Sequence, residues 1–227
     1  MRILHAIVAL LLPLATAGLH AAEPPRIMAV GDSITQGGGN SFATYRHLLA
    51  DVLHAKGRSF EFVGSQTSQH VGVACRHEGY GGKNAEFLAS ILEAKLRAHP
   101  ADLVMIQAGH NHFAEENPVP GIVEAQRRMI VIARQQNPAA IVLIAQVIPS
   151  AKLPKYAYLP DLNAALAKLA QEMHSPAQPV LLVDLATGFD PATDTVADKV
   201  HPNQAGAAKI AERWAAALSP LLPARNR

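Results

Sequence analysis

Residues 27–37 read IMAVGDSITQG, an apolar run that gives way to a polar, glycine-containing stretch. A short run of this kind, rich in branched side chains, is typical of a strand buried on both faces. Ser33 is therefore expected at the rim of a sheet, where a substrate can reach it and backbone N–H groups point toward the same place. A serine in this position is a candidate nucleophile, but it needs an adjacent base. The alternative is a turn serine that caps the next helix.

A candidate base lies near the other end of the chain, where residues 198–203 read DKVHPN before a helical pattern. Asp198 and His201 are three residues apart on one turn and can lie side by side. Pro202 keeps His201 out of the α region and suits the first position of a helix. Asp198 can then hold one ring nitrogen of His201 while the other nitrogen faces Ser33. A nucleophile, a base and an orienting acid are thus available, in the chain order Ser–Asp–His.

The rest of the chain alternates between strand-like and helix-like patterns. Such alternation predicts an α/β fold, a three-layer α/β/α sandwich around a five-stranded parallel sheet. The predicted strands lie at 26–30, 60–63, 102–108, 140–148 and 179–185, and the helical stripes at 45–53, 88–96, 122–133, 162–173 and 210–218. In parallel sheets, ligands bind beyond the carboxyl ends of the strands. The loops that carry Ser33, Gly82, Asn111 and His201 should therefore meet at one edge.

Four blocks of sequence resemble those of the GDSL/SGNH hydrolase superfamily. They are GDSIT at 31–35, HEGYGG at 77–82, GHNH at 109–112 and DKVHPN at 198–203. The glycine block is most similar to the carbohydrate-esterase branch that includes secreted acetylxylan esterases. The resemblance spans residues 26 to about 218. It implies a flavodoxin-like SGNH hydrolase fold and a serine esterase that uses Ser33, Asp198 and His201 without a cofactor or a metal.

The donors of an oxyanion hole can also be named. Gly81 and Gly82 precede a helical pattern that begins near Asn84, which offers an exposed N–H to an anion. The resemblance favours Gly82, because in similar families the contributing glycine immediately precedes the helix, and Gly81 is the alternative. Asn111 adds a side-chain amide, although asparagine is also common in turns. With the Ser33 N–H, these groups make three donors for the oxyanion of an acyl-transfer intermediate.

Further polar side chains near the blocks are candidate substrate contacts: Asp32, His77, Tyr80, His110 and His112. His112 stands where the family more often has Asp, and this departure affects the loop around Asn111. A zinc site is an alternative, because His110 and His112 have His-x-His spacing and His70 and His77 lie in a neighbouring segment. No carboxylate-plus-His spacing completes a recognised zinc pattern, so histidines that line an acyl or sugar pocket are favoured.

Residues 64–83 show no clear period, and a stretch of this length predicts a binding loop. The alternative is an irregular surface loop without a role in binding.

The N-terminus predicts a secretory signal. Arg2 is followed by an uncharged run at 6–15 and then by small residues. The run is shorter than the ~18 apolar residues that a membrane span requires, so no stable membrane insertion is expected. Residues 1–22 are predicted to be a signal peptide and 23–227 a single esterase domain, exported to a bacterial periplasm or secreted. The alternative is an uncleaved amphipathic tail.

Composition narrows the partners. Charged residues make up 17% of the chain and the net charge is +2, without a basic stripe or an acidic tail. Nucleic acid and anionic membranes are therefore not expected partners. Cys75 is the only cysteine, so no internal disulfide can form, and a buried or incidental thiol is favoured over a reactive one.

The predicted activity is removal of acetyl groups from carbohydrate, and the partner is a small-molecule or polysaccharide ester. The same superfamily also contains lipases, thioesterases, lysophospholipases and arylesterases, which bind longer acyl chains or other alcohols. A non-catalytic carbohydrate-binding protein is an alternative from another class, because a fold does not imply an activity. Metal-dependent hydrolysis is a third alternative.

Overall fold

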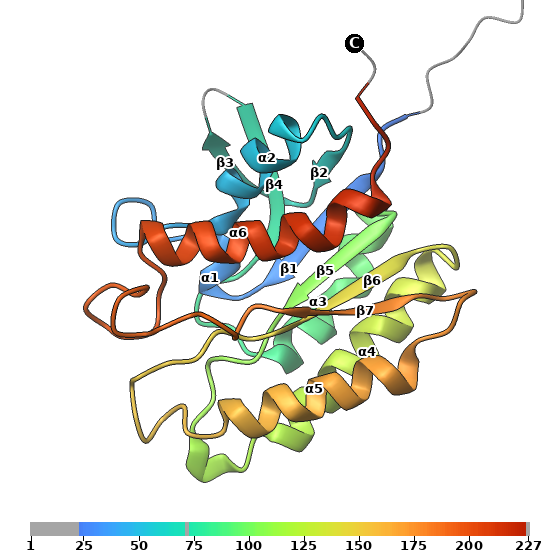
Figure 1. Ribbon diagram of the computed structural model, residues 1–227. Helices are drawn as coiled ribbons and strands as arrows, with labels where there is room; N and C mark the ends of the chain where they lie inside the picture. Colours follow the sequence, from blue (N-terminus) through green and yellow to red (C-terminus); the bar gives the residue numbers. More distant parts are fainter. Residues whose placement is uncertain (1–22, 71–72, 226–227) are drawn as a thin grey trace, which may run out of the picture.

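The computed structural model describes residues 23–70 and 73–225 of the chain. Within these residues, a seven-stranded sheet lies between two layers of helices (Figure 1). The strands are β1 (Arg26–Gly31), β2 (Glu61–Val63), β3 (Gln66–His70), β4 (Val73–Gly79), β5 (Leu103–Gln107), β6 (Ile141–Gln146) and β7 (Val180–Asp184). The helices are α1 (Ser33–Gln36), α2 (Tyr45–Ala55), α3 (Ala85–Ala98), α4 (Val119–Gln136), α5 (Leu159–Met173) and α6 (Gln204–Leu218), with 3-10 turns η1 (Ala114–Glu116) and η2 (Ser219–Leu221). The predicted signal peptide, residues 1–22, lies outside the described residues.

The sheet is built around β1. On one side β1 pairs in parallel with β5, and β6 and β7 continue the parallel order. On the other side β2 and β4 share the edge of β1, with β2 pairing its first half and β4 its last two residues, Val30 and Gly31. Across the parallel part of the sheet the order is β2 and β4 together, then β1, β5, β6 and β7. This corresponds to the flavodoxin-like order 2-1-3-4-5, in which β2 and β4 share the first position.

The predicted fold class is confirmed, and all five apolar runs form parallel strands. The predicted strand count is wrong, because β3 and β4 form an antiparallel hairpin inside the stretch 64–83 that was expected to be a loop. The sequence of β3, QTSQH, carries no apolar face. β3 pairs with β4 through backbone hydrogen bonds, which any residue except proline can form at the edge of a sheet.

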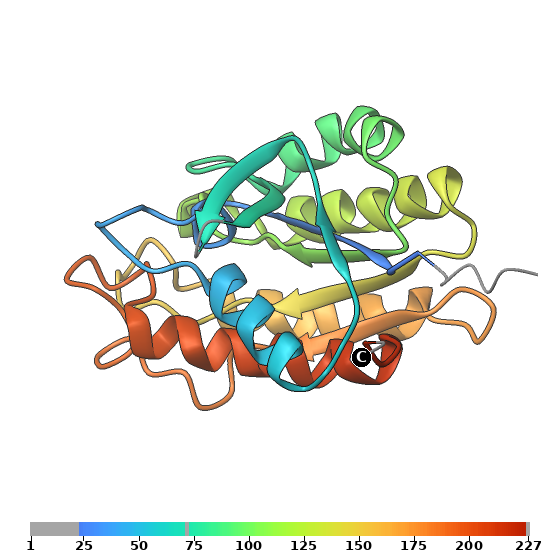
Figure 2. The same cartoon turned by 90° about the horizontal axis from the view of Figure 1, so that it is seen from above.

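The helices cover the two faces of the sheet, each over its own apolar core. One face packs against α3, α4 and α5, and the other against α2 and α6. Figure 2 shows α3 and α4 on the opposite side of the sheet from α2 and α6. Trp214 of α6 is fully enclosed in the second core, where Cys75 is also buried. Burial of such side chains is the main source of stability in a domain without a disulfide. The favoured prediction of a buried thiol is thus confirmed.

The carboxyl ends of the parallel strands point to one edge of the sheet. The segments that follow β1, β6 and β7 gather there (Figure 1). This is the edge at which the sequence predicted a site.

None of the helices in the described ranges is both long enough and apolar enough to cross a bilayer.

Candidate active site

Three side chains from opposite ends of the chain meet at this edge. The Ser33 Oγ lies 2.8 Å from the His201 Nε2, and the His201 Nδ1 lies 2.5 Å from the Asp198 Oδ2. With the proton on Nδ1, the ring donates to the carboxylate, and Nε2 can accept the proton of the Ser33 hydroxyl. The side chains of His201 and Asp198 are 23% and 38% exposed, so a ligand can reach the group. The arrangement can move a proton from the hydroxyl to the imidazole.

A tight turn holds Asp198 and His201 together. The Asp198 Oδ1 accepts the N–H groups of Val200 at 2.9 Å and of His201 at 3.0 Å. Lys199 adopts a left-handed φ of 62° inside the turn, and the Val196 N–H closes it on the His201 carbonyl at 2.9 Å. Partial burial alone would raise the Asp198 pKa, but the hydrogen bonds from His201 and Val200 outweigh it and hold that pKa below its usual value. The carboxylate therefore stays ionised beside the imidazole.

Ser33 is the first residue of the short helix α1. Asp32 caps this helix, because its Oδ1 accepts the Ile34 N–H at 2.9 Å. The alternative role of Ser33 as the cap is therefore not the one observed. Gly31 ends β1 so close to α1 that an added Cβ would lie 2.2 Å from the Thr35 Oγ1. Only glycine fits there, and this close approach fixes Ser33 at the point where the strand ends.

Asp32 and His110 form a buried pair. They are 1% and 2% exposed, and the Asp32 Oδ2 lies 3.8 Å from the His110 Nδ1. Burial raises the pKa of Asp32 to about 6, although the Ile34 N–H and the nearby His201 pull it the other way. Burial, and then repulsion from His201, lowers the pKa of His110 to about 4. Both side chains are therefore enclosed by protein, and their expected contact with a substrate stays a prediction.

Gly81 and Gly82 form the turn between β4 and α3. The Gly81 N–H donates to the Gln36 Oε1, and a Cβ added at Gly81 would lie 3.8 Å from the Ser33 Cβ. The turn is therefore a direct neighbour of Ser33. Gly82 has a φ of 73°, and an added Cβ there would meet nothing within 4 Å. Because Gln36 occupies the Gly81 N–H, Gly82 is the better candidate for an oxyanion donor.

Asn111 follows β5 and adopts a left-handed φ of 68°. Its Nδ2 donates to the Lys83 carbonyl at 3.0 Å, which joins it to the glycine turn and leaves a second N–H on the same amide. His112, the departure from the family pattern, lies between two carboxylates, 3.0 Å from the Glu86 Oε2 and 3.3 Å from the Glu116 Oε2. His112 therefore ties the Asn111 loop to α3 and η1, and both of its ring nitrogens have partners.

The side chains of His77 and Tyr80 form hydrogen bonds with residues of β4. His77 is buried, and its Nδ1 accepts the Gly79 N–H at 3.0 Å. Burial, and then repulsion from Arg46, lowers the pKa of His77 to about 3. The Tyr80 hydroxyl donates to the Glu78 Oε2 at 2.6 Å. His77 is thus enclosed and Tyr80 is half-buried, and their expected contacts with a substrate stay predictions.

Three of the four histidines proposed as zinc ligands are engaged separately, and the side chain of the fourth, His70, lies outside the described part of the structure. His110 faces Asp32, His77 accepts from Gly79, and His112 lies between two glutamates. Across the described ranges 23–70 and 73–225, no three or more His, Cys, Asp or Glu side chains are grouped to hold a metal ion.

Phe42 is a site residue that the sequence did not reveal. Its ring stacks on the His201 imidazole, with centroids 4.0 Å apart and an interplanar angle of 21°. The next residue, Ala43, donates its N–H to the Pro202 carbonyl at 3.1 Å. The segment before α2 therefore braces the loop that carries His201. A phenylalanine before a predicted helix gives no sign of such a contact, so this role needed the structure.

Arg46 is a second residue that was missed. It is fully buried in α2 and donates to two carbonyls of α1, those of Thr35 at 2.5 Å and Gln36 at 3.0 Å. The guanidinium thereby holds the helix that presents Ser33. A signal was available, because Arg46 shares the buried face of α2 with Leu49 and Leu53 at helical spacing.

Similarity to known proteins covers most of the chain. The model of the GDSL-like lipase/acylhydrolase family matches residues 29–209. A multidomain esterase from Ruminococcus flavefaciens is 26% identical over 238 residues, and the aligned region is 90% of this chain. The chain spans only about 30% of the length of that curated relative.

Two solved structures are also similar. A carbohydrate esterase family 3 protein from Talaromyces cellulolyticus superposes with a TM-score of 0.76 at 25% identity, covering 87% of this chain and 97% of the other. An acetyl esterase mutant with acetate ion gives the same TM-score, identity and coverage.

Proposed function

The chain belongs to the GDSL-like lipase/acylhydrolase family, so its domain is a carboxylic ester hydrolase, and from this premise we propose that Ser33, His201 and Asp198 are its catalytic triad. The observation that supports the proposal is the continuous chain of contacts from the Ser33 hydroxyl through the His201 ring to the Asp198 carboxylate, at 2.8 and 2.5 Å. These are the contacts by which a base activates a hydroxyl and an acid orients the base.

The proposed reaction has two steps. The Ser33 Oγ attacks the carbonyl carbon of the ester while His201 Nε2 takes the hydroxyl proton. The carbonyl oxygen becomes an oxyanion, for which the N–H groups of Ser33 and Gly82 and the Asn111 amide are the proposed donors. The bond to the alcohol then breaks, and His201 gives its proton to the leaving oxygen. Water repeats the sequence on the acyl-enzyme and releases the acid.

The proposed substrate is an acetyl ester of a carbohydrate. The similar structures named as a carbohydrate esterase and an acetyl esterase support this choice, as does the glycine block at residues 77–82. The proposed location is the bacterial periplasm or the medium, after removal of residues 1–22. A small-molecule or polysaccharide ester is then the partner of the exported enzyme.

The first test is Ser33→Ala in the full chain, assayed on p-nitrophenyl acetate. The variant should lose the hydrolysis that exceeds the uncatalysed rate, while its circular dichroism spectrum and thermal midpoint stay those of the wild type. Retained turnover by a folded variant would remove Ser33 from the mechanism.

The second test is a profile of p-nitrophenyl esters from acetate to octanoate, followed by an acetylated xylo-oligosaccharide. A sharp preference for acetate, with release of acetate from the oligosaccharide, supports a carbohydrate substrate. Faster turnover of long chains would replace it with a lipid or thioester substrate.

A further inference from the structure

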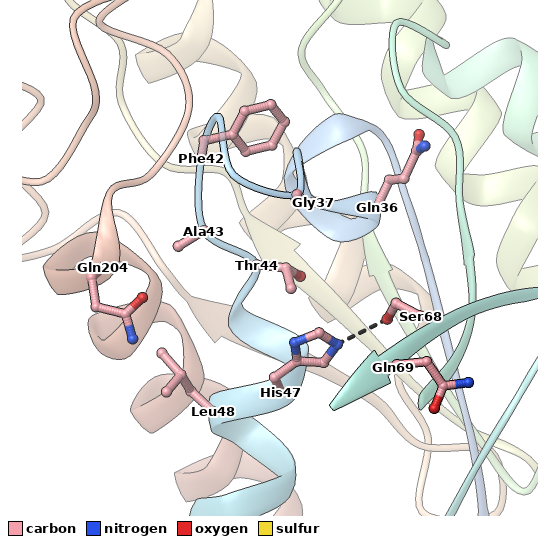
Figure 3. Close-up of a pocket in the computed structure, with 11 residues that line it drawn as sticks. Gln36, Gly37, Phe42, Ala43, Thr44, His47, Leu48, Ser68, Gln69 and Gln204 are labelled. Atoms are coloured by element: carbon pink, nitrogen blue, oxygen red, sulfur yellow. Dashed lines mark hydrogen bonds between the residues drawn. The ribbon is translucent and has the colours of Figure 1, made fainter. Parts of the chain in front are cut away.

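A pocket of about 390 Å³ lies beside the candidate active site. It is bounded by the segment between α1 and α2, the start of α2, the strand β3 and the start of α6, and its labelled side chains are drawn in Figure 3. Its volume is within the range of roughly 300–1,000 Å³ that small-molecule sites occupy. None of the residues to which we assign the triad or the oxyanion hole lines it.

The pocket and the His201 imidazole are joined through Phe42. The Phe42 side chain lines the pocket, and its ring stacks on His201 at 4.0 Å. Gln36 makes a second connection, because it also lines the pocket and its Oε1 accepts the Gly81 N–H beside Ser33. The pocket is therefore next to the reacting groups, on the side of the imidazole.

The lining mixes apolar side chains, such as Phe42 and Leu48, with uncharged polar ones, and the described residues that form it include no Asp, Glu, Lys or Arg. Amides, hydroxyls and one imidazole are the polar side chains of the lining: Thr44, His47, Ser68, Gln69 and Gln204. Figure 3 shows Gln69 and Gln204 on opposite sides, with the His47–Ser68 hydrogen bond of 2.8 Å between them. An amide both donates and accepts hydrogen bonds, which matches a sugar hydroxyl, whereas an anion would require a cation.

We propose that this pocket binds a sugar unit of the alcohol part of the substrate, a neighbour of the unit that carries the acetyl group. The inference rests on the proposed function, in which His201 protonates the leaving alcohol. The alcohol must then leave on the imidazole side, where Phe42 separates the ring from the pocket. The glycan chain continues past Phe42, and the pocket amides bind the hydroxyls of its next unit.

The test is the double variant Gln69→Ala/Gln204→Ala, assayed on two substrates. One is an acetylated xylo-oligosaccharide, which extends into the pocket, and the other is p-nitrophenyl acetate, which does not. Loss of two amide partners should lower the ratio of kcat/KM for the oligosaccharide to kcat/KM for the aryl ester by about fivefold or more, through a higher KM. Gln171→Ala on α5, in the opposite helical layer, is the matched control and should leave the ratio as it is in the wild type.

The outcomes separate the pocket from the reaction. If the wild type deacetylates the oligosaccharide and the double variant keeps the same ratio, the pocket proposal is overturned and the proposed function stands. If the wild type cleaves p-nitrophenyl acetate but not the oligosaccharide, both the carbohydrate substrate and the sugar pocket are overturned. Should the double variant not fold by circular dichroism, Gln204→Ala alone at the exposed start of α6 gives the same comparison.

Discussion

Phe42 and His201 are stacked face to face, with ring centroids 4.0 Å apart, although 159 positions separate them in the chain (201 − 42). The contact adds a second restraint on the imidazole, independent of Asp198, which holds the ring through Nδ1. Since Asp198 fixes one edge of the ring and Phe42 one face, His201 has little freedom to turn its Nε2 away from Ser33.

We therefore expect Phe42→Ala to slow the enzyme on p-nitrophenyl acetate. An aromatic pair contributes about 0.5–1.5 kcal/mol beyond its buried area, which corresponds to roughly a 2- to 12-fold fall in kcat if the contact acts on the transition state. Phe42→Tyr keeps the ring and is the control. The prediction fails if the alanine variant matches the wild type in kcat while the tyrosine variant is equally active.

Asn111 provides a test of the oxyanion hole that is free of backbone strain. Its φ of 68° favours glycine, so Asn111→Gly removes the amide without straining the loop. Loss of one such donor typically costs about 2.7–4 kcal/mol, or roughly a 100- to 1,000-fold fall in kcat. Steady-state kinetics on p-nitrophenyl acetate measure the effect, and a loss smaller than threefold would show that the amide is not a donor. The thermal midpoint of the variant separates a catalytic effect from unfolding.

Asp198→Asn should leave the turn in place but disturb the imidazole. An asparagine oxygen can still accept the backbone N–H groups of Val200 and His201. Its amide cannot act as the charged acceptor for Nδ1–H, so the tautomer with a basic Nε2 loses its support. We expect kcat to fall by roughly 10²- to 10⁴-fold, in the range that general base catalysis supplies. A variant that retains half of the wild-type kcat would argue that His201 does not depend on Asp198.

Asp32 predicts a pH dependence of stability. Its pKa of about 6 in the folded protein lies above the unfolded value of about 3.9. The buried acid therefore binds its proton more tightly when folded, and this contribution is present below pH ~4 and is lost as the pH rises through 6. Asp32→Asn keeps an oxygen for the Ile34 N–H and cannot ionise. As the pH rises from 4 to 8, the difference in the free energy of unfolding between the variant and the wild type should therefore shift by roughly 3 kcal/mol in favour of the variant.

Urea unfolding of both proteins at several pH values measures this difference. His110→Gln is a useful control, because it removes the imidazole next to Asp32 but leaves the carboxyl group in its buried place. If the difference between Asp32→Asn and the wild type does not change with pH, Asp32 does not titrate in this window.

The sequence predicted the parts of the fold that depend on apolar periodicity. The five parallel strands and the helices α2 to α6 all bury apolar stripes, and burial of this kind leaves a repeating pattern. The hairpin β3–β4 and the helix α1 leave no such pattern. The ladder between β3 and β4 consists of backbone hydrogen bonds, and α1 is a single turn of four residues. Polar pairing and very short elements were therefore not predictable from periodicity.

The candidate site divides in a similar way. Ser33, Asp198 and His201 stand in short blocks whose spacing indicates chemistry, and the structure brings them together as expected. Their catalytic roles stay a prediction until the variants are measured. The stack of Phe42 on His201 joins residues from unrelated blocks, so no local pattern could predict it. Asp32 was expected at the substrate; the structure shows it buried with one carboxylate oxygen capping α1, a role that the sequence did not indicate, and its contact with a substrate stays a prediction.

The turn from Val196 to His201 is closed on itself by its own hydrogen bonds, and Asp198 reaches both the backbone and the ring of His201 within it. His201 and Asp198 thus form one hydrogen-bonded unit, whereas Ser33 belongs to a separate part of the chain. We therefore expect the Ser33–His201 contact to be lost before the rest of the fold on warming, which parallel measurements of activity and circular dichroism would check. To make the enzyme more resistant to heat, substitutions should first strengthen the contacts between the turn that carries His201 and the segment that carries Ser33.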